Sequence, residues 1–288
     1  MLLVTVIDEL EFHLTVKQRS IETIRGYKLD LLALDRYFVE KTNGPVYVED
    51  LTTEDIESYL ETLVMTGKYA VASINRYINS IRVLGQFAYK KGWMETDITK
   101  DIESLKGEKK ERTYLTEKEL IDLFEVIHHP LICLAARTMA FSGLRVSECI
   151  HLTLEDVDLE NDLIYVIEGK GKKDRTVPIS KSLKPYLVDY IDNWRVETTS
   201  NRFFATKKTG SLSSQYINRK LHDAVKKLGW KKKVTAHILR HSFASNLVAK
   251  DVNIVKVSKL LGHADLKTTS IYTHANHKQL SEAVDLLG

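Results

Sequence analysis

The sequence lacks the features typical of secreted, membrane-spanning and zinc-binding proteins. Its 288 residues include two cysteines, Cys133 and Cys149, without Cys-x-x-Cys or Cys/His spacing, so we predict free thiols and no metal site. The longest apolar runs, residues 1–7 and 131–141, are too short to cross a bilayer. No basic segment precedes an apolar core at the N-terminus. We therefore expect no membrane association and a cytoplasmic, nucleoid-associated location.

A nucleotide-binding loop is also missing. Gly169-Lys170-Gly171 does not fit the pattern Gly-x-x-x-x-Gly-Lys-Ser/Thr and does not open a helix. ATP or GTP use is therefore disfavoured, and we expect no cofactor.

Length and charge predict two domains. A chain of 288 residues exceeds what one core usually fills. Residues 1–103 hold 12 basic and 17 acidic side chains, whereas residues 104–288 hold 30 and 22. Residues 104–113 carry dense mixed charge with one apolar residue, which is typical of an exposed linker. We predict a first domain at 1–103, this linker, and a second domain at 114–288 that attracts a polyanion.

Hydrophobic periodicity predicts a mainly α-helical protein with one small β-sheet. In the first domain, helices are expected after Ser20, after Thr52 or Thr53, and over residues 72–91. In the second, Thr116 and Glu119 form a capping-box pattern. Runs at 163–167 and 175–179 predict a β-hairpin with a basic tip. Further helices are expected over residues 131–142, 183–194, 214–228, 239–249, 253–261 and 266–274.

Two helices carry polar side chains suited to reading base edges. Ordinary solvated faces are an equally good interpretation. The basic residues at the end of the hairpin tip are expected to be solvated or to contact the DNA backbone. These candidate DNA-binding residues are Asn75, Asn79, Arg82, Gln215, Asn218, Arg219, Lys172, Lys173 and Arg175.

Two arginines and a histidine suit metal-free chemistry on a phosphodiester. Such chemistry needs cationic donors for the phosphate oxygens, an in-line nucleophile and a proton for the leaving oxygen. Arg145 and Arg240 offer guanidinium groups whose paired N–H groups match two phosphate oxygens. His237 precedes Arg240 by three residues, so both point to similar sides of one helix start. Its imidazole suits proton transfer near neutral pH.

The remaining roles fall to Lys170, His263 and Tyr272. Lys170 at the hairpin tip has the reach to protonate a departing alkoxide. His263 follows Gly262, which is expected to end a helix. The phenol of Tyr272 is nucleophilic when neighbouring cations or a base assist its deprotonation.

Together these segments resemble the tyrosine recombinase family. The matching motifs are Gly143-Leu144-Arg145, Gly169-Lys170-Gly171, His237-x-x-Arg240 and Leu261-Gly262-His263 followed by Tyr272. The resemblance covers nearly the whole chain and all six catalytic positions, and the chain's size is similar to that of the compact Xer-like members. It implies a C-shaped clamp on double-stranded DNA, formed by a helical core-binding domain of SAM-like type and the catalytic domain.

The resemblance also implies a reaction. Tyr272 would attack the scissile phosphate, giving a 3′-phosphotyrosyl link and a free 5′-hydroxyl, while Lys170 protonates the leaving oxygen. Arg145, Arg240 and His263 would stabilise the phosphorane, and His237 would assist proton transfer. A homotetramer on two DNA sites would form a Holliday junction, coupled through exchange of a C-terminal helix at about 276–287, with a second recombinase or accessory protein as a further partner.

Several functions are compatible with this set of residues. Resolution of chromosome or plasmid dimers or of transposon cointegrates is favoured by the compact size, and integration or excision of a mobile element is the alternative. A type IB topoisomerase uses similar residues but acts as a monomer. A non-catalytic DNA-binding protein is the third possibility, and it would tolerate loss of Tyr272.

Overall fold

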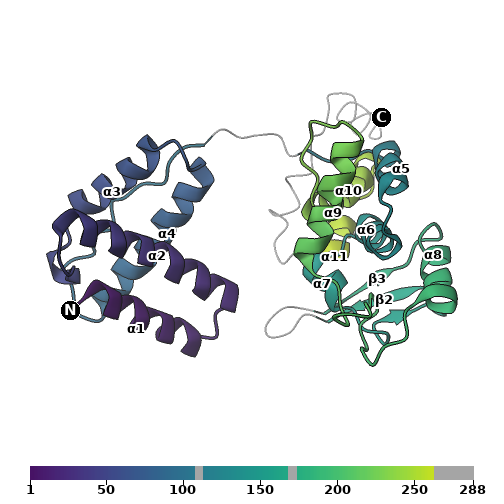
Figure 1. Ribbon diagram of the computed structural model, residues 1–288, viewed down its shortest axis with the longest axis horizontal. Helices are drawn as coiled ribbons and strands as arrows, with labels where there is room; N and C mark the ends of the chain where they lie inside the picture. The colour runs from purple at the N-terminus through teal and green to yellow at the C-terminus, as the bar shows by residue number, and fades with distance from the viewer. Residues whose placement is uncertain (108–112, 168–173, 263–288) are drawn as a thin grey trace, which may run out of the picture. The chain divides into compact units, whose positions relative to one another are not determined.

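The computed structural model describes residues 1–107, 113–167 and 174–262, and it divides the chain into two compact units, Met1–Lys110 and Glu111–Gly288 (Figure 1). Within the described residues the chain is mainly helical with one three-stranded sheet, which confirms the predicted fold class. The helices described within these ranges include none that is long and apolar enough to span a membrane. The boundary between the units falls within residues 104–113.

The first unit is built from helices whose apolar faces share one core. Its first helix was not predicted, although buried Leu3, Val6, Ile7 and Leu10 follow a helical period. The elements are α1 (Leu3–Val16), α2 (Ile21–Thr42), a 3-10 turn (Val48–Asp50), α3 (Thr53–Met65) and α4 (Val71–Lys90).

Local capping explains where these helices begin. The Ser20 hydroxyl accepts a hydrogen bond from the Thr23 backbone N–H at 3.2 Å and so satisfies an otherwise unpaired donor of α2. Thr52 and Asp55 form a capping box at the start of α3. These contacts confirm the helix starts predicted at Ser20 and Thr52.

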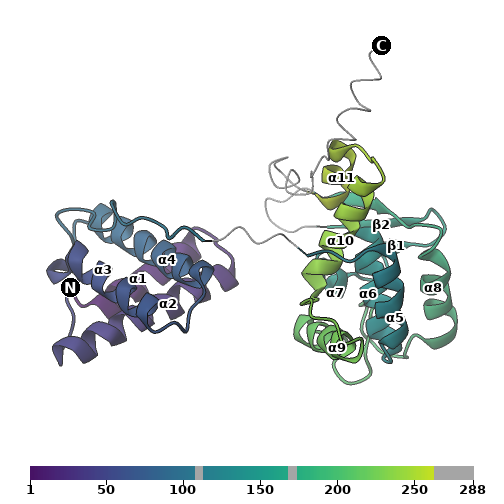
Figure 2. The same cartoon turned by 90° about the horizontal axis from the view of Figure 1, so that it is seen from above.

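In the second unit, helix α6 (Pro130–Ser142) packs against α5 (Glu117–Val126), α7 (Val146–His151), α9 (Ser214–Lys227) and α10 (Ala236–Ala249). The helix α10 packs along α6, and α5 contacts it as well (Figure 2). The capping box predicted at Thr116 and Glu119 is present at the start of α5. The helices are α5 (Glu117–Val126), α6 (Pro130–Ser142), α7 (Val146–His151), α8 (Lys184–Asp189) with a π-helical turn (Tyr190–Trp194), α9 (Ser214–Lys227), α10 (Ala236–Ala249) and α11 (Ile254–Leu261).

The sheet contains the predicted hairpin. Strands β2 (Leu163–Val166) and β3 (Arg175–Pro178) are antiparallel, with Val166 paired to Arg175, and β1 (Val157–Asp158) adds a short edge strand that was not predicted. The hairpin is therefore confirmed, while its tip, residues 168–173, lies outside the described residues.

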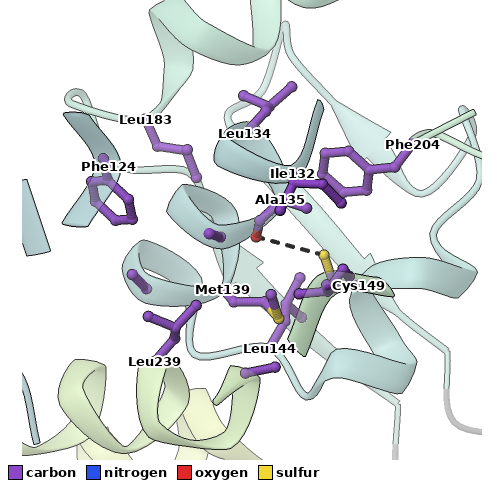
Figure 3. Close-up of a cluster of buried hydrophobic side chains, with 14 of the residues drawn as sticks. Phe124, Ile132, Leu134, Ala135, Met139, Leu144, Cys149, Leu183, Phe204 and Leu239 are labelled. Carbon is purple, nitrogen blue, oxygen red and sulfur yellow. Dashed lines mark hydrogen bonds between the residues drawn. The ribbon is translucent and has the colours of Figure 1, made fainter. Parts of the chain in front are cut away.

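The core of the second unit is closely packed around α6 (Figure 3). Ile132, Ala135 and Met139 of α6 have no exposed surface. The Cys149 thiol points at the Ala135 carbonyl with an Sγ to O distance of 3.9 Å (Figure 3). Burial raises the pKa of this thiol well above its ordinary value. Both cysteines are free, as predicted, and Cys149 has a packing role.

Candidate active site

The carboxylate of Glu148 joins three arginine side chains from three elements of the second unit. Glu148 lies on α7, and only 7% of its side chain is exposed. Its Oε2 accepts the Arg145 backbone N–H at 2.7 Å, and its Oε1 accepts Nη1 of Arg145 at 2.5 Å. Arg175 of β3 donates Nη1 to Oε1 at 3.0 Å and Nη2 to Oε2 at 2.8 Å. Arg240 of α10 forms a longer ion pair, with Nη1 3.7 Å from Oε2.

Backbone carbonyls hold Arg240 in place. Its Nη1 donates to the Gly143 carbonyl and its Nη2 to the Leu261 carbonyl, both at 2.6 Å. These carbonyls lie at the ends of α6 and α11, where helices leave acceptors without an intrahelical partner. The side chain of Arg240 is only 4% exposed, so its direction is set by the fold.

Two glycines make this arrangement sterically possible. Gly143 has a φ of +67°, and a Cβ there would lie 2.5 Å from Cδ1 of Phe243. Gly262 has a φ of +66°, and a Cβ there would lie 2.8 Å from Cδ of Arg175. Both positions require the left-handed conformation and a close approach that a side chain would block. The helix ends predicted at these two glycines are confirmed.

The described residues contain part of the predicted catalytic set. Arg145 and Arg240 meet at Glu148, as described above. His237 lies in the first turn of α10, three residues before Arg240, and is exposed. Helix α10 begins at Ala236, earlier than the predicted start at residue 239. The predicted residues Lys170, Lys172, Lys173, His263 and Tyr272, and the predicted helices at 266–274 and 276–287, lie outside the described residues.

Arg175 differs from its sequence-based interpretation. We expected a solvated charge or a contact to the DNA backbone, but the side chain is 7% exposed and pairs with Glu148. The sequence gives no direct sign of this, because the partner lies 27 positions earlier in the chain.

Asn75 and Arg82 of α4 make hydrogen bonds within the first unit. Asn75 binds both backbone groups of Leu105, at 3.0 Å and 2.8 Å. Arg82 donates to the carbonyl of Ile102 and, at 3.2 Å, to the hydroxyl of Ser104. They thus fasten residues 102–105 to α4, although Ser104 and Leu105 remain exposed, and base reading by these two side chains stays a prediction.

Asn79 also makes a hydrogen bond within the first unit. Its amide nitrogen donates to the hydroxyl of Tyr27 at 3.2 Å, and the residue remains exposed.

The second set of base-reading candidates divides by exposure. Gln215 and Arg219 of α9 are exposed, and the Arg219 guanidinium lies 5.1 Å from the ring centre of Tyr216. The side-chain oxygen of Asn218, in contrast, accepts the Ala236 backbone N–H at 2.9 Å. Asn218 therefore secures the helix start that carries His237.

The role of Glu148 was not predicted from the sequence. It stands three positions after Arg145, which is the spacing of an N-terminal capping residue, and that signal was available. Its contacts to Arg175 and Arg240 had no such signal, because they join segments distant in the sequence.

Comparison with known proteins identifies both units. Residues 7–92 match the phage integrase N-terminal SAM-like domain. Residues 113–279 match the phage integrase family. The chain belongs to the phage integrase family. It is a site-specific tyrosine recombinase, an enzyme that transfers DNA strands.

Relatives align over nearly the full chain. Tyrosine recombinase XerC of Halalkalibacterium halodurans is 31% identical over 92% of this chain and 91% of its own length. Tyrosine recombinase XerD of Staphylococcus aureus is 33% identical over 96% of both chains. The Xer-like recombinase assignment therefore applies to the whole chain and not to one unit alone.

Solved structures give the same result. XerH bound to a palindromic difH substrate in a post-cleavage complex has a TM-score of 0.74 at 25% identity, covering 94% of this chain and 81% of that one. The Tn1549 transposon integrase in complex with transposon right end DNA has a TM-score of 0.82 at 17% identity, covering 100% and 99%. The second likeness supports the fold alone.

Proposed function

We propose that this recombinase cleaves DNA by attack of Tyr272 on a phosphodiester held by Arg145 and Arg240, without a metal or nucleotide. The products are a 3′-phosphotyrosyl link and a free 5′-hydroxyl. The observation that carries the proposal is the cluster of three arginines around the single carboxylate of Glu148.

The charge of this cluster suits the reaction. The four described side chains carry three positive charges and one negative charge, which leaves a surplus of two. A phosphodiester carries one negative charge, whereas the phosphorane formed by attack of an oxyanion carries two. The surplus therefore attracts the transition state more strongly than the ground state, which is the condition for catalysis. Low exposure of Arg240 strengthens the attraction by its positive charge, because water screens buried charges less.

The remaining roles complete the mechanism. Lys170 donates a proton to the leaving 5′-oxygen, and His263 stabilises the phosphorane alongside the arginines. His237 assists proton transfer, and its position in the first turn of α10 near Arg240 supports this role. Bond energy is retained in the phosphotyrosyl ester, so a 5′-hydroxyl from a second strand reverses the step.

We further propose that the enzyme works as a homotetramer on two DNA sites and passes through a Holliday junction. Exchange of the C-terminal segment at about 276–287 couples assembly to Tyr272, with a second recombinase or an accessory protein as a further partner. The compact size of the chain, which is similar to that of the Xer-like recombinases, favours resolution of chromosome or plasmid dimers or transposon cointegrates over integration and excision.

A nicked suicide substrate tests the central step. The wild-type enzyme should become covalently trapped on DNA in EDTA without ATP, and the Tyr272→Phe variant should not. An equal adduct from Tyr272→Phe would refute Tyr272 as the nucleophile. Relaxation of supercoiled plasmid lacking a paired site, by a monomer, would instead assign the chain to a topoisomerase activity.

A further inference from the structure

Arg175 makes contacts that link three elements around the phosphate-binding arginines. Arg175 is the first residue of β3, and its backbone pairs with Val166 of β2. Its two terminal nitrogens bind the two carboxylate oxygens of Glu148 on α7, at 3.0 Å and 2.8 Å. Its Nε donates to the Leu260 carbonyl at the end of α11, at 2.9 Å. Three donors of one guanidinium are thus directed to two different elements.

We propose that Arg175 is a positioning residue for DNA cleavage, which holds Glu148 and the end of α11 so that Arg145 and Arg240 meet the scissile phosphate in a fixed geometry. The proposal rests on the function proposed above, in which those two arginines bind the phosphate.

The geometry of Glu148 supports this role. A single carboxylate that contacts Arg145 and Arg240 could rotate toward either one. The paired hydrogen bonds from Arg175 fix the carboxylate plane, because a guanidinium and a carboxylate match as two parallel forks. Arg145 then receives a fixed acceptor at Oε1, and its guanidinium is oriented through that contact.

The end of α11 is held by two arginines at successive carbonyls. Arg175 binds the Leu260 carbonyl and Arg240 binds the Leu261 carbonyl. Cationic groups stabilise the C-terminus of a helix, where carbonyls lack partners. A shift of Arg175 would therefore displace the end of α11, which holds Arg240, as well as the carboxylate of Glu148, which holds Arg145.

Two observations support a positioning role for Arg175. Its Nε, Nη1 and Nη2 all bond within the unit, to the Leu260 carbonyl and to both carboxylate oxygens of Glu148, whereas the Arg145 side chain is 33% exposed. Gly262 also leaves the space through which Arg175 passes, since a Cβ there would lie 2.8 Å from its Cδ. The chain thus accommodates Arg175 inside the unit and leaves Arg145 closer to the surface.

Single-turnover cleavage of a nicked suicide substrate by the full-length chain tests the proposal, with DNA affinity measured separately. Arg175→Gln should bind the site within about threefold of wild type but cleave about 100-fold more slowly, since small displacements of positioning groups have effects of this size. Arg195→Gln is the matched control. Arg195 also donates to two backbone carbonyls, but these belong to Ser200 and Arg202 and not to the cluster around Glu148. The cleavage rate of Arg195→Gln should therefore stay at the wild-type value below the melting temperature.

A second substrate distinguishes positioning of the arginines from general loss of structure. A neutral methylphosphonate at the scissile position reduces the need for positive charge, so the defect of Arg175→Gln should shrink to about tenfold or less, in parallel with Arg145→Gln. An equal defect on both substrates would overturn the proposal, as would wild-type cleavage by Arg175→Gln. Absence of an adduct from the wild-type enzyme would overturn the proposed function itself.

Arg175→Lys decides the matter if Arg175→Gln does not fold. Lysine keeps a positive charge beside Glu148, but its ammonium cannot reproduce the flat fork and the bond to Leu260 together. We expect cleavage about tenfold or more below wild type with unchanged DNA affinity. A wild-type rate would show that charge alone suffices and would refute the positioning role.

Discussion

Replacing Glu148 by glutamine should strongly destabilise the second unit. Glutamine keeps the size of the side chain but removes the negative charge from among Arg145, Arg175 and Arg240. One of its terminal atoms becomes an NH₂ group, which would face a guanidinium donor where an acceptor stood. Glu148 and Arg175 are each 7% exposed, and Arg240 is 4% exposed, so water cannot replace the lost interactions fully.

The expected loss in free energy of unfolding follows from the low exposure of these side chains. Removing one partner of a buried ion pair costs about 3–5 kcal/mol, because the remaining charges stay buried without compensation. We expect a value near the lower end, about 3 kcal/mol, since Arg145 retains solvent contact and Arg240 keeps its carbonyl partners. For a unit of this size, about 3 kcal/mol corresponds to a fall in melting temperature of about 6–12 °C.

Calorimetry on the full chain measures this loss, because the two units can unfold in separate transitions. Glu117→Gln is the control, since its carboxylate is 61% exposed and pairs with the exposed Lys250. That substitution should cost about 0.5 kcal/mol or less. If Glu148→Gln lowers stability no more than Glu117→Gln, the carboxylate does not hold the arginines together and the reasoning is wrong.

Three further predictions concern other contacts of the second unit. Gly143→Ala should destabilise it by about 2–4 kcal/mol in urea unfolding, because alanine must adopt a positive φ and overlaps Phe243; a loss below about 1 kcal/mol would contradict this. Burial alone would raise the pKa of Glu119, but hydrogen bonds from Lys232 and the capping-box N–H lower it below its ordinary value of 4.5. The stabilising contribution of Glu119 should therefore be complete above pH 4.5 and lost as pH falls through the lower folded pKa. The free energies of unfolding of wild type and Glu119→Gln should differ at neutral pH and become equal in acid. A difference that stays constant with pH would refute the assignment. Cys149 should resist alkylation in the folded protein, because burial raises the pKa of its thiol, whereas modification at the rate seen in denaturant would show that the core is not closed.

Local patterns in the sequence were sufficient for much of the secondary structure. Ser20, Thr52 and Thr116 were predicted to begin helices, and each does so with a hydrogen bond to a residue three positions later. The hairpin around residues 168–173 was predicted from a change of period and a glycine-rich tip. These features depend on near neighbours in the chain, which is why the sequence alone predicts them.

Side-chain partners across the fold were harder to predict. The stripe of Asn75 and Arg82 on α4 predicts either a base-reading face or an ordinary solvated face, and neither pattern indicated that both side chains hold residues 102–105. Arg175 was interpreted as a solvated charge, yet it pairs with Glu148. Periodicity shows that a polar residue lies outside the apolar face, but it does not show which backbone group meets it.

The sequence by itself determined the family, because the spacing of Arg145, His237, Arg240 and the later motifs is specific even though each residue alone is ordinary. The tertiary structure alone decided how the arginines are held. Glu148 forms ion pairs with Arg145 at the start of α7, Arg175 of β3 and Arg240 of α10. Gly143 and Gly262 leave room for these elements to pack closely. The physical reason is that the contacts joining these elements form only when helices and strands pack, and no short-range signal in the chain encodes a carboxylate shared by residues up to 92 positions away.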